Sequence, residues 1–250
     1  MVMALPKIKL VISYDGTDFH GFARQPGLRT VQGVLEEHLA KIHNTPVEVF
    51  GSGRTDAGVH AVGQVVHFER EVGPPAERYV YLLRRSLPPD IVPVSAEEVA
   101  VDFHARFSVR RKTYRYTIQR ANVPDIFTYR FTWHEPRPMD VELMRRAARD
   151  LVGEHDFTSF CASTTPIEDK RRTLYQVDVT ERGSYLDITC SGNGFLQYMV
   201  RIIVGTLVDL GEGRLRHSIP EILSARDRAQ AGRTAPARGL SLWKVDYEAE

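Results

Sequence analysis

Hydrophobic positions along the chain recur with two periods, which divide it into a series of predicted strands and helices. Residues 8–14 alternate as in a strand, and a helix follows whose apolar residues lie at helical spacing. That apolar stripe consists of Val31, Val34, Leu35, Leu39 and Ile42. The rest of the first half predicts strands at 47–50 and 62–69, a helix at 79–86 and a strand at 91–99.

The second half repeats this order. It predicts a strand at 113–119, a helix at 140–151, strands at 174–180 and 185–190, an apolar helix at 197–210 and a strand at 241–247. Strand-helix-strand-strand-helix-strand is the ferredoxin-like unit, which also underlies RNA-recognition modules. We therefore expect an α+β protein with a half at 1–104 and a half at 105–250. The two halves would join into an extended mixed, mainly antiparallel sheet with a central cleft, because pockets favour such junctions.

Composition narrows the class of protein. With 250 residues, 42% hydrophobic and 26% charged, the chain is typical of globular proteins. No apolar run approaches the roughly 20 residues of a membrane span, and the N-terminus does not resemble a signal peptide. Two cysteines, Cys161 and Cys190, are too few for a disulfide framework or a four-cysteine zinc site. We expect a cytoplasmic protein with reduced, packed thiols and no membrane association.

The net charge is only +1, but basic residues cluster between 105 and 120 with no acid among them. The cluster comprises Arg106, Arg110, Arg111, Lys112, Arg115 and Arg120, with Phe107, Tyr114 and Tyr116 interleaved. Cations for phosphates and aromatic rings for bases favour an RNA partner. The alternative is a sheet edge protected by positive charge.

Residues 51–60, Gly-Ser-Gly-Arg-Thr-Asp-Ala-Gly-Val-His, contain three glycines around one carboxylate, Asp56. Arg54 precedes it and His60 follows, as in a loop that presents an acid to a ligand. A plain connection in which Arg54 and Asp56 form a weak surface ion pair is the alternative. A phosphate-binding loop fits poorly, because there is no Gly-Lys-Ser or Gly-Lys-Thr and Asp56 would repel the phosphate.

Five ordered blocks, from residue 11 to about 245, resemble the TruA family of tRNA pseudouridine synthases. They are Arg54–Ala61 with Gly63-Gln64-Val65; Tyr14-Asp15-Gly16 with Phe19 and Gly21; Phe103–Phe107 with Lys112–Tyr116; Gly153–Phe160; and Met199–Arg201 with Gly205. The resemblance implies two related α+β halves around an active site and isomerisation of uridine to pseudouridine. It further implies tRNA nucleotides 38, 39 and 40 of the anticodon stem-loop as targets, a homodimer, and no cofactor.

The resemblance also implies catalytic roles for Asp56, Tyr114 and Arg201. A carboxylate can capture or stabilise an oxocarbenium-like C1′; addition to C6 of the base and removal of the C2′ proton stay open. Arg201 stands in an apolar helical stretch, so it is either a snorkelling residue or a buried one with a partner. The resemblance makes Asp56 that partner. Tyr114 is either a core residue or a group that stacks on uracil and transfers a proton.

Six further residues are predicted to bind RNA: Arg54, His60, Arg24, Gln32, Arg106 and Lys112. Basic loops at 20–29 and 161–172 are candidate RNA contacts, or plain linkers. His60 and His67 lack a cluster of further ligands, so we predict no metal. Two other functions stay open: a non-catalytic tRNA-binding or chaperone protein with tandem RNA-recognition-like units, and a metal-dependent hydrolase that uses Asp56.

Overall fold

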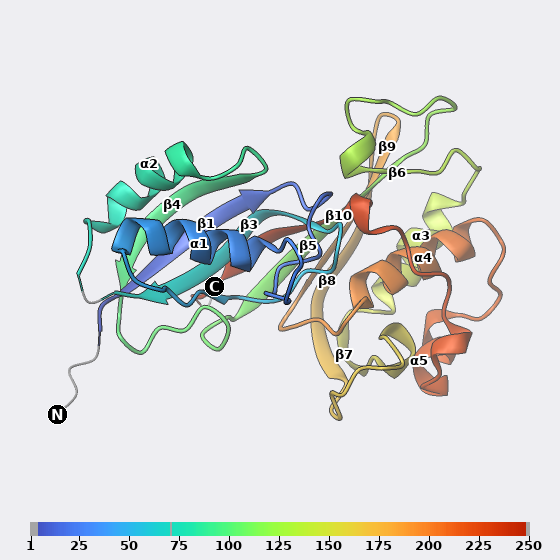
Figure 1. Cartoon of the computed structure of the whole chain (residues 1–250). Helices are drawn as coiled ribbons and strands as arrows, with labels where there is room; N and C mark the ends of the chain where they lie inside the picture. The colour runs from blue at the N-terminus through green and yellow to red at the C-terminus, as the bar shows by residue number, and fades with distance from the viewer. Residues whose placement is uncertain (1–4, 71, 249–250) are drawn as a thin grey trace. The chain divides into compact units, whose positions relative to one another are not determined.

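The computed structural model describes residues 5–70 and 72–248, which form two compact units (Figure 1). The first contains the chain up to Arg110 together with the segment from Leu242 onward, and the second contains Arg111–Ser241. The boundary thus lies six residues after the predicted one, and the C-terminal segment belongs with the first unit. Its contacts explain this: the Arg110 N–H donates to the Asp246 carbonyl (2.9 Å), and the Tyr247 hydroxyl donates to the Ala105 carbonyl (2.8 Å).

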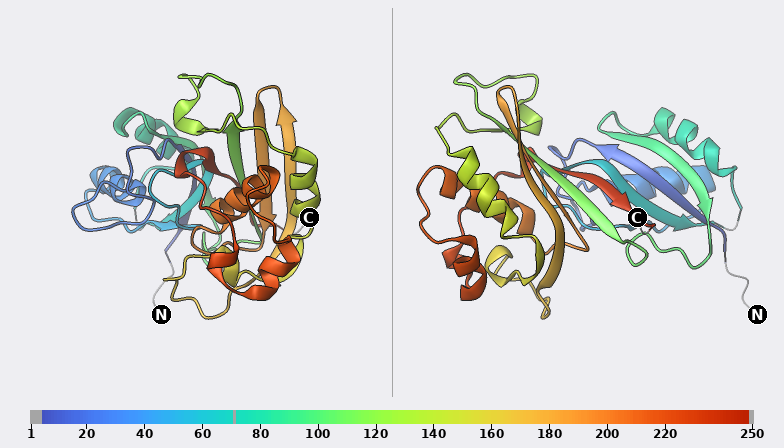
Figure 2. Two further views of the ribbon diagram at one scale, coloured as in Figure 1. Left: turned by 90° about the vertical axis from the view of Figure 1, so that its right-hand side faces the viewer. Right: turned by 180° about the vertical axis from the view of Figure 1, so that it is seen from behind.

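The first unit is a ferredoxin-like sheet with two helices. Its elements are β1 (Lys7–Tyr14), α1 (Val31–His43), β2 (Phe50–Gly51), β3 (His60–Glu69), α2 (Ala76–Ser86) and β4 (Ile91–Val99). The strand order is β4-β1-β3, with β2 paired to β3, and each of these pairs is antiparallel. Helices α1 and α2 cover one face, and the right-hand view of Figure 2 shows the strands from the other. The last strand, β10 (Leu240–Asp246), lies beside β3.

The second unit has a related plan. Its main elements are β5 (Arg111–Gln119), α3 (Val141–Arg149), β8 (Arg171–Arg182), β9 (Tyr185–Gly192) and α4 (Met199–Gly211). Strands β5, β9 and β8 pair antiparallel in that order, and α3 packs on both α4 and β8. Short elements are added: β6 (Trp133–His134), β7 (Gly153–Asp156), α5 (Ile219–Ala225) and the 3₁₀ turns Tyr129–Phe131, Thr158–Phe160, Arg228–Gln230 and Ala237–Gly239.

The structure confirms the α+β class, the mainly antiparallel pairing and the repeated order of elements. It corrects the strand predicted at 47–50, where only Phe50 and Gly51 form a strand. Side chains from α1 replace strand partners there: the Gln32 amide donates to the Val49 carbonyl (3.0 Å), and Glu36 accepts the Val49 N–H (3.2 Å). Because side chains satisfy this backbone, the chain stays extended without a ladder.

Two further expectations concern the membrane and the thiols. Within the described part of the chain, no helix is long and apolar enough to cross a membrane. Cys161 and Cys190 are buried and are not joined in a disulfide. Burial raises the pKa of Cys190 to about 12, so this thiol stays protonated and acts as a packed apolar group.

An extended segment, residues 231–235, lies directly against α4. The Ala235 N–H donates to the Arg201 carbonyl (3.0 Å), and the Arg233 N–H donates to Asp209 Oδ2 (2.8 Å). Between these bonds, a Cβ on Gly205 would stand 1.8 Å from the Arg233 carbonyl oxygen. Only glycine permits this approach of segment and helix.

Replacing Gly205 with alanine should therefore destabilise the protein, although alanine is favoured in helices by about 1 kcal/mol. Overpacking against a backbone carbonyl typically costs 1–3 kcal/mol, so we expect a net loss of about 2 kcal/mol in urea unfolding. Gly211→Ala is the control in the same helix, because the nearest atoms to its Cβ would be those of the Met144 and Met139 side chains and not a backbone carbonyl. Equal stability of the two variants would refute the argument.

Candidate active site

Hydrogen bonds from polar side chains hold the 51–60 loop at its start and at its centre. At its start, Ser52 Oγ donates to Gln64 Oε1 (2.6 Å) and Gln64 Nε2 donates to the Gly53 carbonyl (3.0 Å). At its centre, the hydroxyls of Tyr14 and Thr55 are 2.8 Å apart. Burial raises the pKa of Tyr14 to about 12, so this phenol stays protonated and can hold the loop at neutral pH.

Glycines in the preceding segment let the loop approach the backbone of residues 14–22. A Cβ on Gly16 would stand 1.9 Å from the Val59 carbonyl oxygen, and one on Gly21, where φ is +89°, would stand 2.7 Å from that of Thr55. The Phe22 N–H also donates to the Thr55 carbonyl (3.1 Å). Residues 14–21, which form one of the five blocks that resemble the family, therefore pack against the loop and support it.

Asp56 and Arg54 lie at the outer part of the loop. The Asp56 side chain is half-buried and Arg54 is exposed. The Asp56 carbonyl accepts the Val59 N–H (3.1 Å), which closes a tight turn with Gly58 at φ +75°. The carboxylate thus stands on a fixed turn, next to a cation that solvent can reach.

His60 has a different position from the predicted RNA contact. It is buried, and its Nδ1 accepts the Gly16 N–H (2.9 Å) and lies 3.2 Å from Asp15 Oδ1. A side chain in this position joins the end of the loop to the end of β1. His60 thus has a structural role in the protein, and its contact with RNA stays a prediction.

Gln32 is also an internal brace. Its amide donates to Glu36 Oε1 (3.0 Å) and to Val49, while its Oε1 accepts the Arg24 N–H (2.9 Å). The Arg24 guanidinium contacts Glu36 Oε2 (3.1 Å), yet its side chain is 68% exposed. Arg24 is therefore exposed and Gln32 supports its backbone, and RNA binding by these two residues stays a prediction.

Tyr114 and Arg201 belong to the second unit. Tyr114, on β5, is 8% exposed, and its ring meets Phe195 edge-on with centroids 5.0 Å apart. Its neighbour Tyr116 is fully buried and donates to the Pro236 carbonyl (2.8 Å). Both tyrosines are thus packed, but only Tyr114 retains surface.

Arg201 is half-buried on the first turn of α4. Its Nε donates to the Ala235 carbonyl (2.8 Å), and its guanidinium lies 5.1 Å from the ring centre of Tyr198. Tyr198 has φ +62°, a conformation that is strained for an aromatic residue and that clusters at functional sites. Sequence patterns gave no signal for Tyr198, because left-handed backbone at a tyrosine is not readable from residue type.

Acidic side chains neutralise part of the positive charge of the basic stretch at 105–120. Arg115 pairs with Asp187, and Arg120 pairs with Glu181 at 2.6 Å. Lys112 is half-buried on β5, whereas Arg106 is exposed. In the loop at 20–29, Arg29 likewise forms two bonds to Asp90 (2.8 and 3.0 Å). Acids distant in sequence neutralise part of both predicted RNA surfaces.

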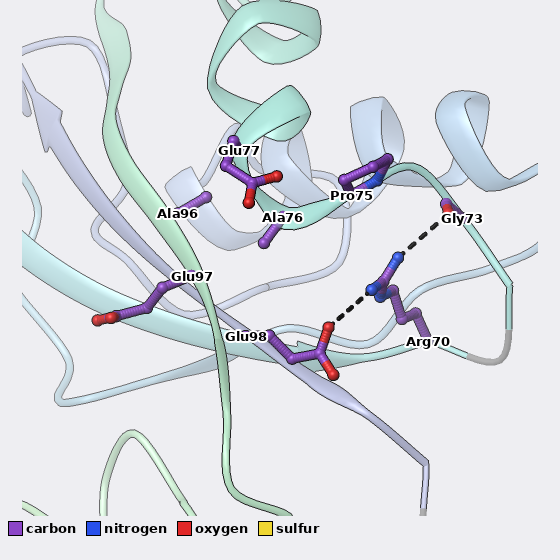
Figure 3. Close-up of a pocket in the computed structure, with 8 residues that line it drawn as sticks. All are labelled: Arg70, Gly73, Pro75, Ala76, Glu77, Ala96, Glu97 and Glu98. Carbon is purple, nitrogen blue, oxygen red and sulfur yellow. Dashed lines mark hydrogen bonds and ion pairs between the residues drawn. The ribbon is translucent and has the colours of Figure 1, made fainter.

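A separate hollow lies between the start of α2 and β4 (Figure 3). Arg70 donates there to the Gly73 carbonyl (3.1 Å) and to Glu98 (3.0 Å), and Glu77 and Glu97 also line the hollow. None of the residues that line it is a predicted site residue, so this hollow is not part of the candidate site. Among the described residues, no three His, Cys, Asp or Glu side chains gather as a metal site.

The chain is similar to known proteins of one family. A model of the tRNA pseudouridine synthases matches residues 10–108 and 147–248. The chain belongs to the tRNA pseudouridine synthase family. Three relatives, each named tRNA pseudouridine synthase A, come from Brevibacillus brevis (50% identical over 97% of this chain and all of the relative), Bacillus velezensis (48% over 97% and 99%) and Bacillus subtilis (48% over 97% and 99%).

The family match confirms the resemblance seen in the sequence. Asp56 and Arg201 both lie within the two matched ranges, and Tyr114 lies in the interval between them. The relatives bridge that interval, since their similarity extends over nearly the whole chain.

His67 makes the stability of the folded protein depend on pH. It is buried, its Nδ1 accepts the Ala105 N–H (3.2 Å), and burial lowers its pKa from 6.5 to about 4. Between these values the unfolded chain binds a proton that the folded protein does not, so stability falls as the pH decreases from about 6.5 to about 4. The loss is at most about 3 kcal/mol.

His67→Asn keeps an acceptor for Ala105 but cannot titrate, so its unfolding free energy should decline less over this range than that of the wild type. His20→Gln, at an exposed histidine, should retain the wild-type profile. Parallel profiles for wild type and His67→Asn would show that His67 does not carry the effect.

Proposed function

We propose that this protein isomerises uridine to pseudouridine in tRNA, at nucleotides 38, 39 and 40 of the anticodon stem and loop. The observation that carries the proposal is the half-buried Asp56 on a rigid loop in a chain of this family. In the reaction the N1–C1′ bond breaks, a C5–C1′ bond forms, the C5 proton leaves and N1 acquires a proton. No electrons are gained or lost, so the reaction needs no redox cofactor.

Asp56 is proposed to act at the ribose or the base, where a carboxylate stabilises the oxocarbenium-like centre that develops as N1 leaves. Arg201 is proposed to hold that carboxylate ionised. Tyr114 is proposed to stack on the uracil and to assist proton transfer at C5. The support for Tyr114 is that it keeps 8% of its surface exposed beside Phe195, and the support for Arg201 is the hydrogen bond that fixes its Nε on the Ala235 carbonyl.

The bound tRNA is proposed to contact Arg54, Arg24, Arg106 and Lys112. Arg54 adjoins Asp56 and is exposed, so it is the natural contact for a phosphate beside the reacting nucleotide. A uridine in a stem must be flipped out, which costs a few kcal/mol that phosphate contacts have to offset. We also propose that the enzyme is cytoplasmic, because a tRNA substrate and two buried free thiols are typical of that compartment.

We infer that the protein works as a homodimer, as the family resemblance implies. Residues 123–131 expose several large apolar side chains, among them Phe127 (87% exposed) and Ile126 (78%). Asp125 fixes this loop by accepting the Phe127 N–H (2.9 Å) and the Tyr185 hydroxyl (3.1 Å). A rigid apolar patch suits a protein interface, and a net charge of +1 lets two copies approach without strong repulsion.

Asp56→Asn tests the catalytic proposal. It should slow release of tritium from C5-labelled tRNA by at least roughly 10³-fold in single turnover, because the asparagine keeps the shape of the loop but cannot supply the carboxylate. The tRNA Kd should change less than about twofold, since affinity rests on phosphate contacts. Asp102→Asn, an exposed acid of the same unit, is the control.

Three other results would lead to different conclusions. No tritium release by the wild type would favour the non-catalytic tRNA-binding protein. Chain cleavage or free uracil that still carries the C5 tritium would favour a hydrolase, because hydrolysis leaves the C5–H bond intact. Rapid release by Asp56→Asn, prepared free of host enzyme, would remove Asp56 from the mechanism.

Phe127→Glu tests the dimer. A charge in the centre of the patch should convert a species of two chains into one of a single chain, as measured by light scattering after size exclusion. Val94→Glu, at a half-exposed apolar residue of β4, should leave the mass unchanged. A dimeric Phe127→Glu variant would exclude this surface as the interface.

A further inference from the structure

Phe107 is an aromatic side chain held outward on a turn of the first unit. It is 75% exposed, although its ring rests on His104 with centroids 4.3 Å apart and an interplanar angle of 34°. The Arg106 guanidinium lies 5.6 Å from the ring centre. A flat apolar surface is therefore presented to solvent beside a cation.

The turn that carries Phe107 is fixed by its own hydrogen bonds. His104 Nδ1 accepts the N–H groups of Arg106 (3.1 Å) and Phe107 (3.4 Å). The Ser108 hydroxyl accepts the His104 N–H (3.0 Å), and the Ser108 N–H donates to the His104 carbonyl (2.9 Å). Phe107 is thus exposed on an ordered turn, and little conformational entropy would be lost when a ligand binds it.

A stack of rings supports this turn from below. His104 packs against His67 (4.6 Å between centroids), and His67 stacks on Phe50 (5.1 Å, 23°). Burial lowers the pKa of both histidines, so His104 is neutral at pH 7 and its Nδ1 can accept the two N–H groups. The exposed ring is the outermost member of a series that begins in the core.

We propose that Phe107 and Arg106 form a binding site for one unpaired base of the tRNA, with the base on the Phe107 ring and its phosphate on Arg106. This inference rests on the proposed function. An aromatic ring beside arginine is the usual site for an unpaired base. Arg106 and Arg110 are exposed and lie on either side of Phe107 in the sequence.

The proposed site adjoins the start of the 51–60 loop, where Phe50 pairs with His67, and lies far along β3 from the end of that loop. His67, which supports it, lies seven residues along β3 from His60, at the end of that loop. At roughly 3.3 Å per residue, this is about 23 Å. We therefore infer that a nucleotide bound at Phe107 is a second contact with the RNA, apart from the end of the loop at His60.

Equilibrium binding of unmodified tRNA transcript at several salt concentrations tests the proposal. Phe107→Ala should raise the Kd about tenfold, the size of one base–aromatic stack, without changing the slope of log Kd against log salt. Phe107→Tyr keeps the stacking face and should bind within about twofold of wild type. Phe107→Leu keeps apolar bulk without the π face and should resemble the alanine variant.

Two further variants complete the set. Arg106→Gln should reduce the salt slope by about one, as expected for one lost phosphate contact. Val101→Ala, on the adjoining exposed turn, is the control for local disturbance and should bind like wild type. Thermal unfolding checks that every variant is folded, which the exposure of Phe107 favours.

Wild-type affinity in Phe107→Ala, or in Phe107→Leu, would overturn the proposal. So would a change in molecular mass without a change in affinity, because Phe107 would then contact a second protein. Tritium release by the wild type is measured in parallel. If the wild type binds tRNA but releases no tritium, the proposed activity fails and the Kd series still decides the base-binding site.

Discussion

The contact between Gly16 and the Val59 carbonyl is the constraint on which the candidate site depends. A side chain at position 16 would stand 1.9 Å from that oxygen, so the ends of β1 and the 51–60 loop could not meet. The Tyr14–Thr55 hydrogen bond and the bond from Gly16 to His60 both require this approach. Asp56 is therefore positioned by backbone packing, which gives the precision that catalysis needs.

In the second unit, a glycine on a helix permits a similarly close approach to a backbone carbonyl. Gly205 lets residues 231–235 lie on α4, and this segment brings the Ala235 carbonyl to Arg201 Nε. Asp209 holds the segment at its other end through the Arg233 N–H. In each unit, then, the charged group proposed to act in catalysis depends on a glycine that admits a backbone carbonyl, and an added methyl would displace that group without touching it.

Periodicity and motif predicted the local structure well, because both depend on neighbours in sequence. The stripe from Val31 to Ile42 and the loop around Asp56 are examples. Partners distant in sequence were not predictable: His60 meets Gly16 across 44 positions, and Arg115 meets Asp187 across 72. Acids distant in sequence therefore neutralise part of the acid-free run, and His60 joins the end of the loop to Gly16, a contact that the sequence did not predict.

That neutralisation affects how the protein can hold a polyanion. The chain has 33 basic and 32 acidic residues, and internal pairs such as Arg29–Asp90 and Arg115–Asp187 occupy many of the cations. Attraction to phosphate must then come from local groups of exposed arginines rather than from the net charge of the chain. With fewer charges to contribute, contacts to bases must supply a larger share of the affinity, and those contacts require rigid, accessible rings of the kind that Phe107 provides.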